Sequence, residues 1–161
     1  MDDIFYMKQA LKRAKAAYKE WETPVGAVIV KDGRIISSGR NFREKKKNAL
    51  MHAELIAIDR ACKRLGSWRL VDCELYVTLE PCAMCAGAII NARLNRVVFG
   101  AFDAKAGSFG SLVNLTDYPY NHKPEIVGGI LADECAEMLS DFFKELRIKK
   151  KKQPYVKEEK I

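Results

Sequence analysis

The sequence predicts an α/β sandwich built as one domain. Its 161 residues fit a single domain, which is long enough to bury a substantial core. Short β-branched runs alternate along it with segments of helical periodicity, and we find no internal repeat and no linker. Strands that alternate with helices place the helices on the faces of a sheet. We expect one domain over residues 1–147, followed by a basic C-terminal tail over residues 148–161.

The N-terminal third is expected to contain a helix and a hairpin. The first helix carries apolar side chains at helical spacing, and Asp2 or Asp3 can cap its start. The hairpin is indicated by two apolar runs on either side of a turn that contains Gly33. The expected elements are a helix (2–20), a strand (25–30), a tight turn (31–33), a return strand (34–38) and a polar, basic loop (41–51).

The remaining elements are expected to continue the alternation. Gly66 is typical of a helix end, and Pro81 ends a short β-branched run. Residues 100–124 contain several glycine, asparagine and proline positions and are expected to be a long loop. The expected elements are a helix (52–65), a strand (75–79), a helix (83–92), a strand (96–99), a last strand at 126–127 and a final helix (133–147).

The charge balance is basic, with a formal net charge of +7. Two segments carry much of the excess, residues 40–47 and residues 147–160. Such segments suit a polyanionic partner bound through its phosphates, but a solvated basic tail is an equal alternative on charge alone. No run approaches the ~20 apolar residues of a membrane span. The acidic N-terminus lacks the pattern of a secretory signal, so we expect a cytoplasmic protein without a membrane partner.

Two short motifs bring metal-ligand residue types to the starts of two expected helices. The first is His52-Ala-Glu54, and the second is Pro81-Cys82-Ala-Met-Cys85. Cys82 and Cys85 are three residues apart and therefore lie on one face of the same helical turn. The free N–H groups and positive dipole of a helix start favour the thiolate, which is the form that binds a metal. Zinc accepts thiolate sulfur and imidazole nitrogen.

The number of ligands indicates the kind of zinc site. Only two histidines are present, and the three other cysteines show no paired spacing, so we expect these cysteines to be small buried thiols without disulfides. Three protein ligands leave one position for water, which is the pattern of a catalytic zinc. Glu54 stands two residues after His52 and is expected to carry protons. The three unpaired cysteines are Cys62, Cys73 and Cys135.

Either motif alone is weak. C-x-x-C alone can be a redox pair or a chance occurrence, and a helical glutamate is commonly a solvated side chain. Together, H-x-E and P-C-x-x-C form the pattern of the zinc-dependent cytidine/deoxycytidylate deaminase superfamily. From Tyr6 to Arg147 the chain resembles the bacterial tRNA-specific adenosine deaminases of that superfamily. The segments that carry this resemblance are 24–28, 75–82, 84–87, 96–100, 110–112, 121–122, 129–131 and 142–143.

The resemblance implies a three-layer cytidine deaminase-like fold with a central five-stranded mixed sheet flanked by helices. It implies a homodimer in which both subunits contribute to the RNA site, with one zinc ion in each subunit. The implied reaction is hydrolysis of adenosine to inosine at the wobble position of an arginine tRNA anticodon, with release of ammonia.

The resemblance also implies residue roles. His52, Cys82 and Cys85 would be the zinc ligands and Glu54 the proton carrier. Asn41 would contact the target nucleoside. Four further residues would approach the anticodon loop, namely Asp103, Asn121, His122 and Phe143.

Two positions depart from the family pattern. Met51 and Phe109 stand where smaller residues are usual, and both are expected to reshape the rim of the pocket. Neither is one of the four chemical residues, so the departures bear on the fit of the RNA and leave the expected reaction unchanged.

Two alternatives remain open. One is a deaminase of a free base or nucleoside such as guanine or cytosine; the basic segments and Asn121-His122 favour RNA over it. The other is a non-catalytic, zinc-stabilised RNA-binding subunit. Glu54 argues against this second alternative, because a purely structural site has no use for a carboxylate beside the metal.

Overall fold

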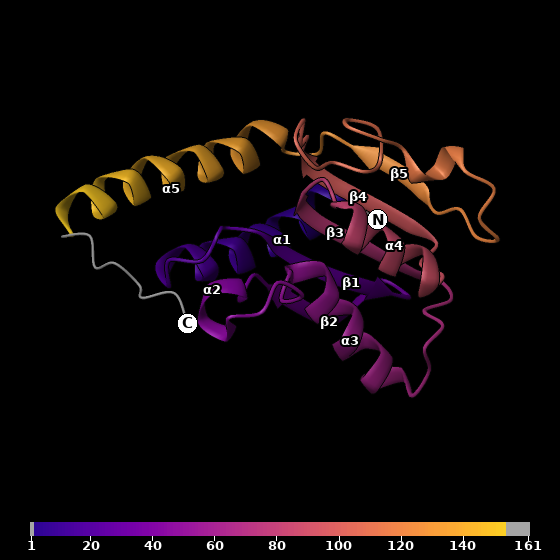
Figure 1. Cartoon of the computed structure of the whole chain (residues 1–161). Coiled ribbons are helices and arrows are strands. Elements are labelled where there is room, and N and C mark those ends of the chain that lie inside the picture. The colour runs from indigo at the N-terminus through magenta and orange to yellow at the C-terminus, as the bar shows by residue number, and fades with distance from the viewer. Residues whose placement is uncertain (1, 154–161) are drawn as a thin grey trace, which may run out of the picture.

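The computed structural model describes residues 2–153 and shows a five-stranded sheet between two layers of helices (Figure 1). The strands are β1 (Gly26–Lys31), β2 (Arg34–Arg40), β3 (Cys73–Leu79), β4 (Arg96–Ala101) and β5 (Glu125–Gly128). The helices are α1 (Asp3–Lys19), α2 (Arg43–Lys46), α3 (Ala53–Leu65), α4 (Ala83–Asn91) and α5 (Ala132–Lys152), with a 3-10 turn η1 (Leu115–Asp117).

The sheet is mixed, with the strand order β2-β1-β3-β4-β5. Strand β1 runs antiparallel to β2 and to β3, whereas β4 runs parallel to β3 and to β5. The predicted α/β fold with a central five-stranded mixed sheet is therefore confirmed. The parallel pair β3–β4 has its carboxyl ends at one edge, and the chain continues from there into the segments that form the site.

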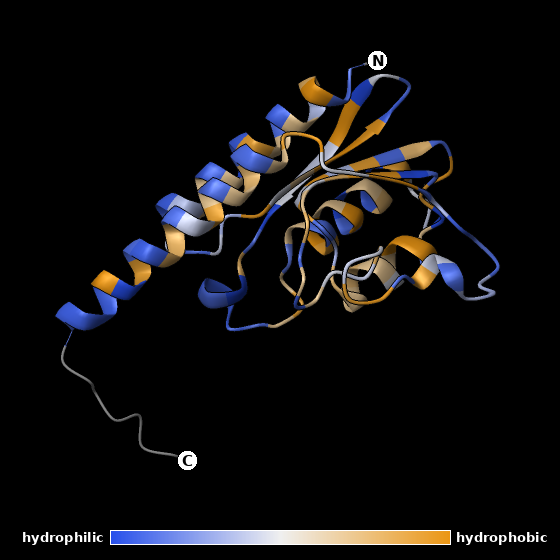
Figure 2. Cartoon of the chain, turned by 90° about the horizontal axis from the view of Figure 1, so that it is seen from above, coloured by the Kyte–Doolittle hydropathy of each residue, from blue (hydrophilic) through white to orange (hydrophobic). Residues whose placement is uncertain are grey.

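Alternating side chains of the strands supply two separate cores, because successive residues of a strand point to opposite faces. Leu75 and Val97 face the layer of α3 and α4, whereas Tyr76 and Val98 face the layer of α1 and α5. The two helical layers are seen on either side of the sheet in Figure 2. The predicted helices and strands are thus present, and apolar side chains of strands and helices meet in one core on each face of the sheet.

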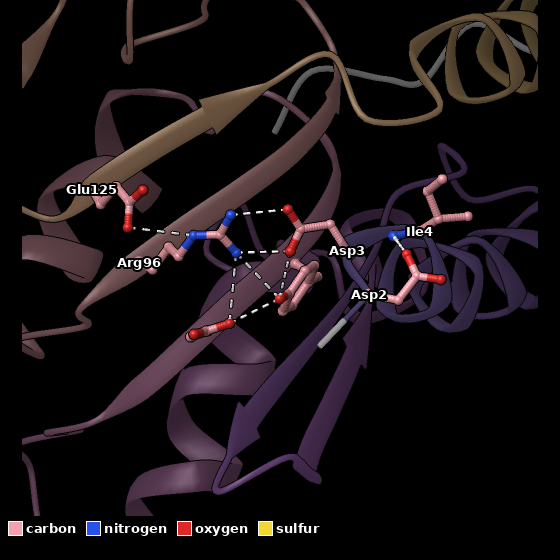
Figure 3. A network of polar contacts seen from close by, with 7 residues as sticks. Asp2, Asp3, Ile4, Arg96 and Glu125 are labelled. Carbon is pink, nitrogen blue, oxygen red and sulfur yellow. Dashed lines mark hydrogen bonds and ion pairs between the residues drawn. The ribbon is translucent and has the colours of Figure 1, made fainter.

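The start of α1 is fixed by a side-chain cap and by an ion pair (Figure 3). The N–H of Ile4 donates to Asp2 Oδ1 at 2.9 Å, as expected for an N-cap aspartate. The Arg96 guanidinium donates to both carboxylate oxygens of Asp3, at 2.8 and 2.9 Å. These contacts attach the first turn of α1 to the amino end of β4.

Arg96 is the centre of a larger polar cluster, which we call the Arg96 network: Asp3, Glu74, Tyr76, Arg96 and Glu125. Arg96 Nε lies 3.4 Å from the Glu125 carboxylate, and Nη1 lies 3.7 Å from that of Glu74. The Tyr76 hydroxyl donates to Glu74 at 2.8 Å. Hydrogen bonds from Arg96 hold the pKa of Asp3 below its usual value, although burial opposes them.

The expectation of a loop without a helix over residues 41–51 was wrong. The expected loop 41–51 contains the short helix α2, whose first turn is held by side-chain acceptors. Asn41 Oδ1 accepts the N–H of Arg43 at 2.9 Å, and the buried Glu22 carboxylate accepts the N–H of Glu44 at 2.9 Å. These acceptors stabilise a helical turn that a polar composition alone does not predict.

The final helix is longer than expected. It continues five residues past Arg147, through Lys152. Lysine is a good helix former, and cations in the last turn interact favourably with the helix dipole. The first part of the predicted basic tail is therefore helical, and residues 154–161 of that tail lie outside the described residues.

The five cysteines are free thiols. Cys73 and Cys135 are buried, as expected. Cys62 is only half-buried, so the expectation of a buried thiol was wrong there; its Sγ lies 3.8 Å from the carbonyl oxygen of Trp68 near the end of α3. None of the helices in residues 2–153 is long and apolar enough to cross a lipid bilayer.

Strand β2 and helix α3 approach each other closely at Gly39. A Cβ placed on Gly39 would collide with the carbonyl oxygen of Ala53 and lie 2.9 Å from the backbone nitrogen of Ala57. A glycine is required because backbone occupies the space of a side chain. The first turn of α3 consequently lies directly on β2.

Candidate metal centre and cavity

Three metal-ligand side chains meet at the starts of two helices. His52 is the N-cap residue of α3, Cys82 is the N-cap residue of α4, and Cys85 lies in the first turn of α4. His52 Nδ1 lies 3.6 Å from the Sγ atom of each cysteine. The three ligand atoms lie within 4.8 Å of one another, and we call these residues the metal group.

The spacing of the metal group fits a tetrahedral zinc ion. Zinc–nitrogen bonds of ~2.0–2.1 Å and zinc–sulfur bonds of ~2.3 Å, at tetrahedral angles, separate nitrogen and sulfur by about 3.6 Å. The measured separations are 3.6 Å. Imidazole and thiolate are also the ligands that zinc prefers. Within residues 2–153, no other group of three histidine, cysteine or acidic side chains is arranged in this way.

Protons are shared unevenly between the two thiols. A hydrogen bond from the Cys85 thiol, together with one from His52, lowers the pKa of Cys82 to about 4. Donation to Cys82 and burial raise the pKa of Cys85 above its usual value. The hydrogen bond to Cys82 likewise raises the pKa of His52. Of the two thiols, Cys82 is therefore the one whose environment favours the thiolate, the form that binds a metal.

Glu54 lies beside the metal group and is buried in the first turn of α3, with 4% of its surface exposed. Burial raises the pKa of Glu54 to about 7, because the charged carboxylate loses its water. The positive charge of His52 opposes this effect. A carboxyl group that titrates near neutral pH can both accept and release a proton.

The metal group and Glu54 open into a cavity of about 160 Å³. Asn41 and Asp103, both predicted to contact substrate, also line it. The structure thus brings together six of the nine predicted site residues. The full lining is Thr23, Val25, Asn41, Arg43, His52, Ala53, Glu54, Leu79, Glu80, Cys82, Asp103 and Ala106, with Cys85 directly behind it.

The other three predicted residues lie away from this cavity. The His122 ring is hydrogen-bonded to the carbonyl oxygen of Leu94 at 2.6 Å, close to the amino end of β4 and therefore at the opposite end of the strand from Asp103. Asn121, its neighbour, is exposed. Phe143 is exposed on α5, where its ring contacts Phe142.

The two departures from the family pattern do not line the cavity either. Phe109 is 5% exposed and belongs to the core between the sheet and the layer of α3 and α4, so the expectation that it shapes the rim was wrong. Met51 is half-buried, and its carbonyl oxygen accepts the N–H of Phe42.

Two buried carboxylates beside the site were not identified from the sequence. Glu22 and Glu80 are 1% and 2% exposed. Glu80 lines the cavity, and Glu22 holds the start of α2, which carries the cavity residue Arg43. The sequence offers one signal for Glu80, a charged residue that follows an apolar strand and precedes a proline. This signal does not show what Glu80 binds, because its hydrogen-bond partners lie more than 20 positions away in the sequence.

Comparison with known proteins identifies the family. The model of the MafB19-like deaminases matches residues 1–147. A tRNA-specific adenosine deaminase of Bacillus subtilis is 53% identical over 150 residues, which cover 92% of this chain and 93% of the relative.

Solved structures agree with this assignment. One from a study of A-to-I editing by tRNA:A34 deaminases at the wobble position superposes with a TM-score of 0.81 at 41% identity, covering 83% of this chain and 98% of that one. A guanine deaminase of Bacillus subtilis, 29% identical and with 99% of each chain covered, gives a TM-score of 0.63. The chain belongs to the MafB19-like deaminases and, within that fold, to the family of tRNA-specific adenosine deaminases.

Proposed function

We propose that this protein is a zinc-dependent enzyme that hydrolyses adenosine to inosine at the wobble position of a tRNA anticodon, with an arginine tRNA as substrate, and releases ammonia. The observation that carries the proposal is the metal group, with zinc-compatible spacing, next to the buried Glu54 in one cavity. The 53% identity to a tRNA-specific adenosine deaminase supports the choice of substrate.

His52, Cys82 and Cys85 would hold one zinc ion per subunit. When bound, the ion supplies Lewis-acid activation of water near neutral pH. The helix starts contribute as well, because their free N–H groups and positive dipoles favour thiolates on Cys82 and Cys85.

Glu54 moves the protons. As a carboxylate it accepts a proton from the attacking water while the oxygen bonds to C6 of the adenine and the C6–N1 π bond opens, and it passes this proton to N1. It then takes the remaining hydroxyl proton and donates it to the amino nitrogen, so that C6=O forms, the bond from C6 to the amino nitrogen breaks and ammonia leaves. Burial raises the pKa of Glu54 and a nearby cation lowers it, which keeps both protonation states accessible during the cycle.

Asn41 and Asp103 are proposed to contact the RNA at the cavity, Asn41 at the target nucleoside and Asp103 at the anticodon loop. The target base must leave its stack to reach the metal group, which costs a few kcal/mol. Bases in an anticodon loop are partly unstacked already, so the cost is smaller there than in a duplex. Phosphate contacts from basic residues such as Arg43 would offset what remains.

The proposed enzyme is a homodimer. Asn121 and His122 do not line the cavity of their own chain, and we propose that they contact the anticodon loop bound at the cavity of the second subunit. Exposed large apolar side chains, among them Trp68 and Leu112, supply surface for such an interface.

Phe143, on the exposed side of α5, is proposed to approach the anticodon loop as well. A tRNA substrate places the reaction in the cytoplasm.

One assay tests the proposal. The purified protein with zinc is incubated separately with an arginine tRNA anticodon stem-loop, free adenosine, guanine and cytosine, and the products are identified by mass spectrometry. Inosine in the stem-loop alone supports the proposal. Turnover of a free base or nucleoside, with the stem-loop unchanged, would establish the small-molecule alternative, which the similarity to a guanine deaminase makes worth testing. Stem-loop binding without any turnover would indicate a non-catalytic RNA-binding subunit.

A further inference from the structure

Glu80 is a buried carboxylate that the proposed chemistry does not use. It follows the last residue of β3 and stands two residues before Cys82. It is 2% exposed, and a charge buried to this extent is unfavourable unless hydrogen bonds satisfy it. Of the ion pairs found in residues 2–153, none includes Glu80.

All four hydrogen-bond donors to Glu80 come from one loop, residues 103–111, which we call the Glu80 loop. Oε1 accepts the N–H of Asp103 at 3.2 Å and the hydroxyl of Ser111. Oε2 accepts the N–H of Phe109 at 3.2 Å and the N–H of Ser111 at 3.1 Å. Three of these donors are backbone groups, so the carboxylate sets the path of the loop and not only the position of its side chains.

The loop is wrapped closely around this carboxylate. A Cβ on Gly107 would collide with the Glu80 carboxylate, so only glycine allows this approach. The N–H of Gly107 donates to the carbonyl oxygen of Asp103 at 2.8 Å, and the N–H of Ser108 donates to that of Pro81 at 2.9 Å. The first bond closes a turn within the loop, and the second joins the middle of the loop to Pro81, the residue before Cys82.

The Glu80 loop forms one wall of the cavity. Asp103 and Ala106 line the same cavity as His52, Glu54 and Cys82. We propose that Glu80 is a positioning residue, neither a metal ligand nor a proton carrier, which holds residues 103–111 as a preformed wall against which the anticodon nucleotides bind. The proposal rests on the proposed function for the identity of the nucleotides, whereas the holding of the loop does not depend on it.

The variant Glu80→Gln tests this role because it keeps the shape and removes the charge. Glutamine presents one carbonyl oxygen and one NH₂ group. If the carbonyl faces Phe109 and Ser111, the NH₂ group faces the N–H of Asp103; if it is flipped, the N–H groups of Phe109 and Ser111 are unpaired. Either arrangement leaves at least one backbone donor of the Glu80 loop unsatisfied.

We expect Glu80→Gln to raise the KM for the anticodon stem-loop about tenfold or more, with a much smaller change in kcat and an unchanged zinc content. Amide hydrogen exchange should become faster across residues 103–111 and stay slow in α3. Ser111→Ala removes one donor and leaves the three backbone bonds, so its KM should rise only about threefold.

Glu74→Gln is the matched control, since Glu74 is a carboxylate on β3, the strand that Glu80 follows, at the end remote from the cavity. It should leave both the KM and the exchange of the Glu80 loop at wild-type values. A Glu80→Gln protein with wild-type KM and wild-type exchange would overturn the proposal, and so would one that had lost its zinc.

If Glu80→Gln does not fold, Ser111→Ala decides the matter, and wild-type KM with wild-type exchange in that variant overturns the proposal. If the wild-type protein makes no inosine, the proposed function fails. Hydrogen exchange in Glu80→Gln then still shows whether Glu80 holds the loop.

Discussion

The two ends of the parallel pair β3–β4 both carry clusters of polar side chains, but the clusters are built in different ways. At the amino end the Arg96 network surrounds one guanidinium with three carboxylates and a phenol. At the carboxyl end Cys82, Glu80 and Asp103 lie beside His52 and Glu54 and line a cavity. The same two strands therefore carry a structural cluster at their amino ends and a candidate chemical site at their carboxyl ends.

The polar side chains of the amino-end cluster are paired with one another. Arg96 donates to both oxygens of Asp3, and both side chains are about three-quarters or more buried, at 21% and 24% exposed. The partners come from α1, β3, β4 and β5, so the cluster joins four elements. Ion pairs between one guanidinium and three carboxylates stabilise the fold, and none of these residues belongs to the metal group.

The carboxyl-end cluster is different because its ligand atoms converge on one point and, within residues 2–153, form no ion pair with a lysine or arginine. No ion pair in the described part of the chain includes Glu54 or Glu80. Parallel strands commonly bring ligand-binding loops to their carboxyl ends, where helix starts also lie. Asp3, Glu74 and Arg96 line a cavity too, of about 380 Å³. The carboxyl-end cluster is therefore distinguished by its converging metal-ligand side chains, and not by an opening alone.

Replacing Cys85 with alanine should have the largest effect, because it removes one of three ligands. We expect zinc to be lost, the melting temperature to fall and the activity to drop more than roughly a thousandfold. Metal analysis and inosine formation measure the outcome. Cys73→Ala is the control, since it removes a buried thiol of β3 outside the metal group. A Cys85→Ala protein with a full complement of zinc would refute the ligand assignment.

Replacing Glu54 with glutamine should abolish turnover and spare the metal. We expect kcat to fall about 10²–10⁴-fold, as is usual when a proton-transferring group is removed, with an unchanged zinc content. Asp59→Asn, an exposed change on the same helix, should keep full activity. Substantial residual turnover in Glu54→Gln would show that protons move by another route.

Replacing Asp3 with asparagine should weaken the Arg96 network at the amino ends of β3 and β4 and leave the candidate metal centre unchanged. The change removes the charge that Arg96 contacts and should lower the free energy of unfolding by about 1–3 kcal/mol. Urea denaturation of the zinc-loaded proteins measures it. The kcat/KM of the variant should match the wild type; a large loss of activity would mean that the two clusters are coupled.

The smallest expected effect is the pH dependence of the contribution that the Asp3 carboxylate makes to the free energy of unfolding. Hydrogen bonds from Arg96 lower the pKa of Asp3, so the unfolded chain, with a pKa of ~3.9, binds a proton more readily than the folded one. The stability advantage of the wild type over Asp3→Asn is therefore full above about pH 5 and declines as the pH falls through the folded pKa. Unfolding of both proteins across this range isolates the contribution. A difference that is constant with pH contradicts the assignment.

The sequence predicted the parts of the molecule that depend on neighbouring residues. The metal group is local in this sense, because His52 and Cys82 each stand at a helix start that can be identified from periodicity and from Pro81. The five strands followed from β-branched runs in the same way. The alternation of apolar side chains then placed helices on both faces of the sheet.

The parts of the fold and of the site that the sequence did not predict depend on contacts between residues that are distant in the sequence, and no local pattern shows such contacts. Glu80 meets Ser111 across 31 positions, and Asp3 meets Arg96 across 93. Phe109 was expected at the rim because it stands where a smaller residue is usual in the family, but it is buried because the Glu80 loop turns it into the core. Helix α2 depends on Glu22, which lies 22 positions before the N–H that it accepts.

The close contact at Gly39 has a consequence for enzyme engineering. Since the backbone of Ala53 occupies the place of a side chain there, a methyl group on residue 39 would act as a wedge under the start of α3. His52 and Glu54 flank Ala53, so the wedge would shift both side chains together relative to the thiols of α4. Libraries aimed at altering substrate choice should therefore hold position 39 constant, although it contacts neither metal nor substrate.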